Sequence, residues 1–310
     1  MEKSALQQEI CRMKKEKNAL IMAHYYQRDE IQEIADFIGD SLALARKAAE
    51  TDADIIVMCG VHFMGETAKI LCPDKKVLVP DLAAGCSLAD SCDPEEFRKF
   101  VEAHPDHTVI SYVNTSAAVK ALTDIVVTSG NARKIVEQLP ANEKIIFGPD
   151  KNLGGYINSV TGRDMLLWNG ACHVHDRFSL EKILELKKEN PGAKVLVHPE
   201  CRRPLQLIAD KVGSTAALLD FARTDDADTY IVVTESGILF EMQRAMPEKK
   251  FIPAPAEDAE CQCNECDYMK LNTLAKVAAC LRDEAPEIIV DPEIAAKAVK
   301  PIERMLEMSK

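Results

Sequence analysis

The stretch ALIMAHYY (residues 19–26) is an apolar segment that ends at a polar residue and carries a second polar residue two positions later. The segments HTVISYVN (107–114) and AKVLVHPE (193–200) repeat this arrangement. Residues two apart on a strand point to the same side. Each strand therefore presents two polar groups at its carboxyl end, where open α/β sheets bind their ligands. The pairs are His24 with Tyr26, Tyr112 with Asn114, and His198 with Glu200.

A hydroxyl residue and then a cysteine follow each pair at similar distances. Ser41, Ser129 and Thr215, the last preceded by Ser214, each lie 17 residues after the first member of their pair. Their contexts, GDSLALARK, TSGNARK and VGSTAALL, are typical of helix starts, where Ser and Thr are favoured caps and free N–H groups bind anions. A loop cysteine follows in each repeat; these cysteines are Cys86, Cys172 and Cys266.

The repeat predicts the fold class. Apolar strands alternate with amphipathic helical stretches such as DEIQEIADFIG (29–39), which is typical of parallel sheets covered on both faces. We therefore expect three homologous, Rossmann-like α/β domains; if they pack around a pseudo-threefold axis, the active site lies at the centre. The expected domains are 20–105, 106–192 and 193–275. Residues 1–19 and 276–310 are expected to form terminal helices that pack on the body, the last one interrupted near Pro301.

Composition narrows the class of protein. The chain has 310 residues and a formal net charge of −12, which argues against a nucleic-acid partner. No apolar run approaches the roughly 18 residues of a membrane span, and the first residues do not resemble a signal peptide, so we expect a cytoplasmic protein without a membrane partner. The 11 cysteines do not suggest a disulfide framework in that setting. Several are expected to be structural: Cys11, Cys59, Cys72, Cys92, Cys201 and Cys280.

The segment CQCNEC (261–266) allows more than one interpretation. Only Cys266 takes the position that matches Cys86 and Cys172, so three thiolates are expected to meet at one point. Three ligands do not close a structural zinc site, but they suit an iron–sulfur cluster with one open iron that acts as a Lewis acid. Cys263 remains open as an alternative ligand or as a redox partner of Cys266.

Seven segments together resemble the quinolinate synthase family (type A) of de novo NAD biosynthesis. The resemblance implies a condensing transferase that joins iminoaspartate and dihydroxyacetone phosphate into quinolinate, with loss of two waters and phosphate. It also implies a [4Fe–4S] cluster with three cysteine ligands, and an aspartate oxidase or dehydrogenase that supplies iminoaspartate. The segments are AHYYQRDEIQEIADFIGDSLALAR, YVNTSAAVKALTDIVVTSGNA, FGPDKNLGGY, NGACHVH, VHPEC, VGST and CDYMKLNTL.

The resemblance also assigns roles to residues. Cys86, Cys172 and Cys266 match the cluster ligands. Glu200 matches a general acid/base and Tyr26 a catalytic tyrosine, and we count Tyr112 and His198 with them as catalytic. Side-chain alternation favours Tyr26 over the adjacent Tyr25. The expected substrate-binding residues are His24, Ser41, Phe63, Met64, Tyr112, Asn114, Ser129, His198, Glu200, Ser214 and Thr215.

Two other functions remain open from the residues. The same cluster and pocket would serve an iron–sulfur hydro-lyase that acts on another hydroxy acid. A redox or zinc-binding regulatory protein built on CQCNEC would need Cys261, Cys263 and Cys266 but not Cys86. His173 and His175 resemble a metal pair, but neither has a counterpart in the other repeats, so we expect them not to bind metal.

Overall fold

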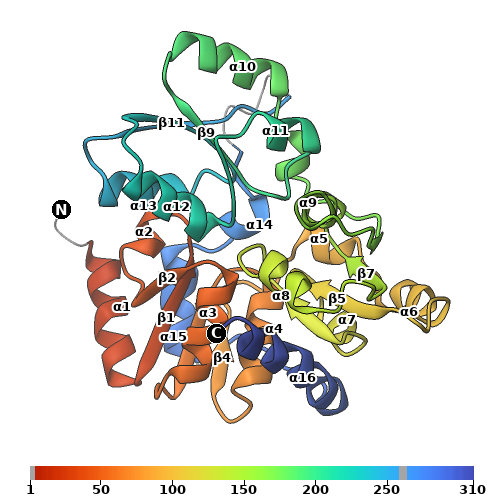
Figure 1. Ribbon diagram of the computed structural model, residues 1–310. Coiled ribbons are helices and arrows are strands. Elements are labelled where there is room, and N and C mark those ends of the chain that lie inside the picture. The colour runs from red at the N-terminus through yellow and green to blue at the C-terminus, as the bar shows by residue number, and fades with distance from the viewer. Residues whose placement is uncertain (1–3, 258–263) are drawn as a thin grey trace.

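The computed structural model describes residues 4–257 and 264–310, and these form three four-stranded parallel sheets (Figure 1). The strand orders are β2-β1-β3-β4, β6-β5-β7-β8 and β10-β9-β11-β12, so one topology occurs three times. This confirms the predicted fold class. The strands are β1 Ala19–His24, β2 Phe37–Gly39, β3 Ile55–Cys59, β4 Lys76–Leu78, β5 Thr108–Tyr112, β6 Ile125–Val127, β7 Ile145–Gly148, β8 Leu166–Leu167, β9 Lys194–Val197, β10 Lys211–Val212, β11 Thr229–Val233 and β12 Lys250–Pro253.

Helices flank the sheets and connect the parallel strands. The central strands are almost continuously apolar and buried, as in IIVMC of β3, because helices cover both faces of each sheet. The helices are α1 Ala5–Glu16, α2 Asp29–Gln32, α3 Ser41–Glu50, α4 His62–Leu71, α5 Ser87–Asp90, α6 Pro94–Glu102, α7 Ala117–Lys120, α8 Ala132–Gln138, α9 Lys151–Thr161, α10 Leu180–Glu189, α11 Arg203–Leu207, α12 Thr215–Thr224, α13 Ile238–Ala245, α14 Asp267–Lys270, α15 Leu274–Asp283 and α16 Pro292–Met308, with a 3-10 turn at His175–Arg177.

The strand order explains where a ligand can bind. In each sheet the chain leaves the first strand (β1, β5 or β9) toward one side, and later returns to its other side. Parallel sheets open a crevice at the carboxyl ends of such strands. The polar pairs found in the sequence lie at the carboxyl ends of these three strands or just after them, so the topology places all three pairs at crevices.

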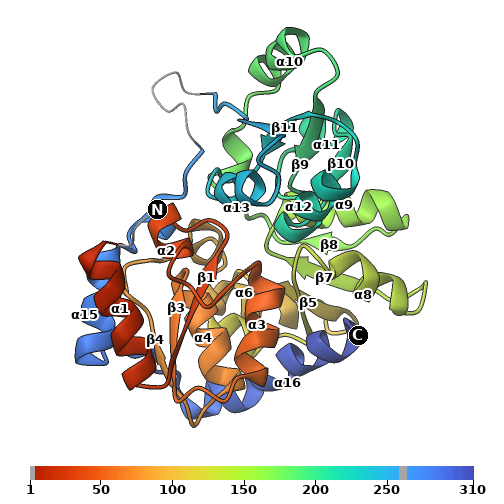
Figure 2. The same ribbon diagram turned by 90° about the vertical axis from the view of Figure 1, so that its left-hand side faces the viewer.

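The terminal helices pack on the first two sheets. Helix α1 packs beside α15 and β1, while α16 packs against α4, α7 and β6 and thereby spans the first two sheets (Figure 2). The predicted interruption at Pro301 is wrong, because α16 is continuous from Pro292 to Met308. Pro301 is buried with Ala298, Ile302 and Met305, and this packing offsets the hydrogen bond that proline cannot donate.

The stretch 29–39 also differs from its prediction as a helix. Only α2 is helical, and Phe37–Gly39 form the edge strand β2, which pairs with Met22–His24 of β1. Asp36 accepts the N–H of Ile21, 2.9 Å away, and so ties this turn to β1. The pairing satisfies backbone groups that an isolated helix would have satisfied internally, and tertiary context therefore overrides local periodicity.

The domain limits taken from the sequence stay a prediction. The largest cluster of buried apolar side chains contains Met22, Ile110 and Leu196, which come from the three different sheets. Among the described helices, none combines the length and the apolarity that a membrane-spanning segment needs.

Candidate active site

A cavity lies where the three sheets meet. Side chains from all three repeats line it, and they include nearly every residue singled out in the sequence. Tyr26 lines the cavity, whereas Tyr25 lines a separate groove, in agreement with side-chain alternation. The predicted site residues that line the cavity are His24, Tyr26, Ser41, Phe63, Met64, Cys86, Tyr112, Asn114, Ser129, Cys172, His198, Glu200, Thr215 and Cys266.

The predicted capping role of the three hydroxyls is wrong. Asp40 caps α3 through Ala43 N–H, and Ser214 caps α12 through Ala217 N–H, so Ser41 and Thr215 are the first helical residues. Ser129 lies in the turn before Asn131, the residue that precedes α8. The hydroxyls of Ser41, Ser129 and Thr215 are therefore not used as caps. Ser214 is not among the lining residues, and its role is the cap.

His24 and His198 share a local hydrogen-bonding device. The N–H of Tyr26 donates to Nδ1 of His24 at 3.2 Å, and that of Glu200 donates to Nδ1 of His198 at 3.4 Å. Burial lowers the pKa of both imidazoles to about 3, so both rings are neutral. With Nδ1 as the acceptor, the proton lies on Nε2, and each ring offers an N–H donor. Nε2 of His198 lies 3.2 Å from Ser129 Oγ.

A chain of hydrogen bonds crosses the cavity wall from Tyr26 to Glu200. Tyr26 Oη lies 2.9 Å from Thr215 Oγ1 and 2.7 Å from Thr234 Oγ1. Thr234 Oγ1 lies 2.9 Å from Nε2 of His175, whose Nδ1 lies 3.0 Å from Glu200 Oε2. These groups provide a continuous path for a proton between a phenol and a carboxylate.

Glu200 is the buried end of this chain. Burial opposes its ionisation, but the imidazole of His175 and the hydroxyl of Tyr112 hold its pKa below the usual range. Tyr112 donates its hydroxyl to Glu200 Oε1 at 2.5 Å. Glu200 is therefore an acceptor within hydrogen-bond reach of Tyr112 and His175, and both of these donors also line the cavity.

Three thiols from the three repeats line the same cavity. Burial raises the pKa of Cys86 to about 12 and that of Cys266 to about 11, and it raises the pKa of Cys172 well above its usual value. Their mutual repulsion adds to this effect. No Lys or Arg is among the described lining residues, although Lys270 lies close enough to lower the pKa of Cys266, so the raised pKa values favour the neutral form of the three thiols. The donor set fits a soft, thiolate-bound metal centre.

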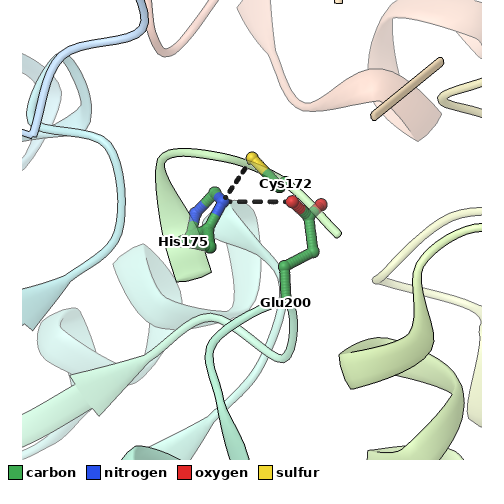
Figure 3. Close-up of side chains that lie close together, drawn as sticks. All are labelled: Cys172, His175 and Glu200. Carbon is green, nitrogen blue, oxygen red and sulfur yellow. Dashed lines mark hydrogen bonds and ion pairs between the residues drawn. The ribbon is translucent and has the colours of Figure 1, made fainter. Parts of the chain in front are cut away.

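His175 is the main site residue that the sequence reasoning missed. Its Nδ1 lies 3.2 Å from Cys172 Sγ, and Figure 3 shows it between that sulfur and Glu200. One ligand atom of each of these three residues lies within 4.8 Å of the others, so they form a metal-capable group. The signal was the spacing in CHVH, because a tight turn brings residues three apart to one side.

The remaining cysteines, one histidine and one asparagine differ in their position relative to the cavity. Cys201 lies outside the cavity, buried with its Sγ 3.5 Å from Val233 O, as expected of a structural thiol. His173 lines the cavity and bonds Ser87 Oγ at 2.5 Å. Asn114 has a buried Oδ1 with no partner among the described residues, which suits a ligand-binding group. Cys261 and Cys263 lie outside the described residues.

Three parallel sheets that converge on a buried cavity of thiols, imidazoles and a carboxylate define a class of α/β enzymes with a central, metal-capable active site. Residues 8–307 match the family described as "Quinolinate synthetase A protein". The chain therefore belongs to this family, and the resemblance seen in the sequence is confirmed.

Similar proteins cover nearly the whole chain. It is 58% identical over 297 residues to a quinolinate synthase from Thermosynechococcus vestitus, covering 96% of this chain and 93% of that protein. A quinolinate synthase from Microcystis aeruginosa is 57% identical over 300 residues, with 97% and 94% covered. One from Chloroherpeton thalassium is 56% identical over 303 residues, with 98% and 94% covered.

Proposed function

We propose that this protein is a quinolinate synthase that condenses iminoaspartate with dihydroxyacetone phosphate and releases phosphate and two waters. The observation that carries the proposal is the meeting of three thiols from three repeats with the Tyr26–Glu200 hydrogen-bond chain in one cavity. Membership of the quinolinate synthetase A family supports the same reaction.

Cys86, Cys172 and Cys266 would hold a [4Fe–4S] cluster. Held by these three residues, the cluster would supply a Lewis acid for the loss of a hydroxyl group. The buried, mutually repelling thiols fit this role, because binding to iron removes the need to protonate them.

The cavity would bind an anionic substrate through neutral donors. The Nε2–H groups of His24 and His198, the hydroxyls of Ser41 and Ser129 and the amide of Asn114 can donate to carboxylate or phosphate oxygens. The N-terminus of α3 adds free backbone N–H groups at Ser41.

Glu200 would move the protons that the reaction requires. Imine formation, tautomerisation and dehydration each need a group that accepts and returns a proton. Tyr112 and His175 hold the carboxylate in place, and Thr234 connects it to Tyr26. Tyr26 would thus act at the far end of the same chain.

An aspartate oxidase or dehydrogenase would supply the unstable iminoaspartate. Direct transfer between the two enzymes is part of the proposal. A complex between the two enzymes that cannot be detected, together with an unchanged flux, would contradict direct transfer.

The proposal is tested by anaerobic purification of wild type and of Cys86→Ala, Cys172→Ala and Cys266→Ala. We expect each variant to lose iron, sulfide and quinolinate formation, while Cys263→Ala keeps all three. Full metal content in Cys86→Ala would overturn the three-thiol site and favour a regulatory site on CQCNEC. A wild type with a cluster that dehydrates another hydroxy acid but forms no quinolinate would favour the hydro-lyase.

A further inference from the structure

Two buried carboxylates occupy equivalent places in the second and third sheets. Strands β7 and β11 take the third position in their sheets, and each is followed two residues later by an acid, Asp150 and Glu235 respectively. Both side chains are fully buried. Neither residue belongs to the proton path described above. Glu235 Oε1 also lies 3.0 Å from Nζ of Lys270, and this ion pair accounts for part of its burial.

Each carboxylate accepts the backbone N–H of the cysteine in its own repeat. Asp150 Oδ2 lies 2.9 Å from the nitrogen of Cys172, and Glu235 Oε1 lies 3.1 Å from the nitrogen of Cys266. The second oxygen of each acid binds the chain just after the strand. Asp150 Oδ1 accepts from Asn152 and Leu153 at 2.6 and 3.0 Å, and Glu235 Oε2 accepts from Gly237 at 2.7 Å.

The first repeat links its strand end to its cysteine loop without a carboxylate. Val61 stands two residues after β3 in place of an acid. There the N–H of His62 donates to the carbonyl of Ala84 at 2.7 Å and ties the loop before Cys86 to the strand end. The strand-to-loop link is thus present in all three repeats, and it is a carboxylate in two of them.

We propose that Asp150 and Glu235 are positioning residues that hold the Cys172 and Cys266 loops in the geometry that binds the metal centre. The inference rests on the proposed function, because it takes these cysteines as ligands. A carboxylate clamped between a strand end and a ligand's backbone restricts the direction of the cysteine sulfur.

The test is the rate at which the reconstituted protein loses iron to a chelator under anaerobic conditions. In Asp150→Asn one oxygen can still accept from Asn152 and Leu153, but an amide NH₂ then faces Cys172 N–H. We expect release to be roughly 10-fold faster or more in Asp150→Asn and in Glu235→Gln. The melting temperature of the apoprotein, measured in parallel, should fall but remain well defined in Asp150→Asn, because Oδ1 still caps α9 while Cys172 N–H loses its acceptor.

Two further variants test whether faster iron release depends on the contact between the carboxylate and the cysteine loop. Glu235→Asp keeps the charge but is one methylene too short to span Cys266 and Gly237, so it should also release iron faster. Asp291→Asn is the matched control, because Asp291 caps α16 through Glu293 and Ile294 but touches no cysteine. If Asp150→Asn fails to fold, the two Glu235 variants carry the test alone.

The outcomes separate this inference from the proposed function. A wild type that holds a cluster, with Glu235→Gln, Glu235→Asp and any folded Asp150→Asn releasing iron at the wild-type rate, would overturn the positioning role and leave the function intact. Equal acceleration in Asp291→Asn would overturn it as well. A wild type that takes up no iron and sulfide would overturn both.

Discussion

Glu200 shows how a single residue receives its role from its neighbours. Glu200 lies two residues after His198 in the sequence. Its side-chain hydrogen bonds, however, go to Tyr112 of the second repeat and to His175, which follows the last strand of the second sheet. Each contact favours the carboxylate over the acid, and together they outweigh burial. The residue is therefore an ionised acceptor in the wall of the cavity.

Replacing this carboxylate by an amide should remove the proton acceptor with little change in shape. We expect Glu200→Gln to lower kcat by about 10²- to 10⁴-fold while iron and sulfide content stay at the wild-type level. Steady-state assays and metal analysis on the same preparation check this. Near-normal kcat with full cluster would show that Glu200 does not carry the proton.

Lys120 is a second buried charge, beneath the cavity wall. It donates to the carbonyl oxygens of Val113, at 2.8 Å, and Thr115, the two neighbours of Asn114, and it lies 5.4 Å from the centre of the Phe63 ring. Burial lowers its pKa to about 8. In the unfolded chain the pKa of a lysine is about 10.4.

This shift predicts a pH dependence of stability. Between pH 8 and about 10.4 the unfolded chain binds more protons than the folded one, so the contribution of Lys120 to the free energy of unfolding rises with pH in this window. The total rise is about 3 kcal/mol. Denaturant unfolding of the apoprotein, wild type against Lys120→Met, isolates it. A difference between the two proteins that stays constant from pH 8 to 10 would contradict the shift.

At the scale of the element, the start of α12 divides two tasks between adjacent residues. Ser214 accepts the N–H of Ala217 at 3.3 Å, and Thr215 bonds the Tyr26 hydroxyl at 2.9 Å. The cap is a local interaction, whereas the second contact crosses from the third repeat to the first. A pattern of Ser or Thr before a helix does not distinguish these tasks.

The division predicts different effects for two similar substitutions. Ser214→Ala should lower the free energy of unfolding by about 1 kcal/mol, the typical cost of losing a cap, and leave KM close to wild type. Thr215→Val removes the hydroxyl beside Tyr26 and should raise KM or lower kcat. Paired unfolding and kinetic measurements check this. A larger kinetic effect from Ser214→Ala than from Thr215→Val would reverse the assignment.

At the scale of the whole molecule, contacts between repeats build the site. Tyr112 with Glu200, Ser129 with His198 and Ser87 with His173 each join two different repeats. Because residues from all three repeats line the cavity, no single repeat contains the whole site. Movement of one repeat against another would change the distances on which the chemistry depends.

Helix α16 spans two of these repeats and should hold them together. Its buried residues Ala298, Pro301, Ile302 and Met305 cover α4, α7 and β6. Ending the chain after residue 290 should lower the free energy of unfolding by several kcal/mol, since each large apolar side chain contributes about 1.5–3 kcal/mol on burial. Thermal unfolding measures the loss. An unchanged melting temperature would show that α16 is not needed to join the sheets.

The sequence by itself determined the threefold repeat, the parallel sheets and the polar pairs at three strand ends. Period-two alternation and a repeat of near-constant length are local properties, so they are readable without coordinates. Cys86, Cys172, Cys266 and Glu200 were found in this way because each occupies a definite place in its repeat. The boundaries of α2, β2 and α16 were not, because pairing with β1 and burial of Pro301 depend on distant segments.

Only the tertiary structure decided which groups complete the site. Several of these groups have no counterpart in all three repeats, and their contacts are with atoms from other parts of the chain. They are His175, Thr234, Asp150 and Glu235. The physical reason is that a buried polar group must find a partner within hydrogen-bond distance, and in this fold the partners lie in other repeats or beyond the next strand. The spacing of residues in the sequence does not give the distances between these hydrogen-bond partners, because the packing of three sheets around one cavity determines them.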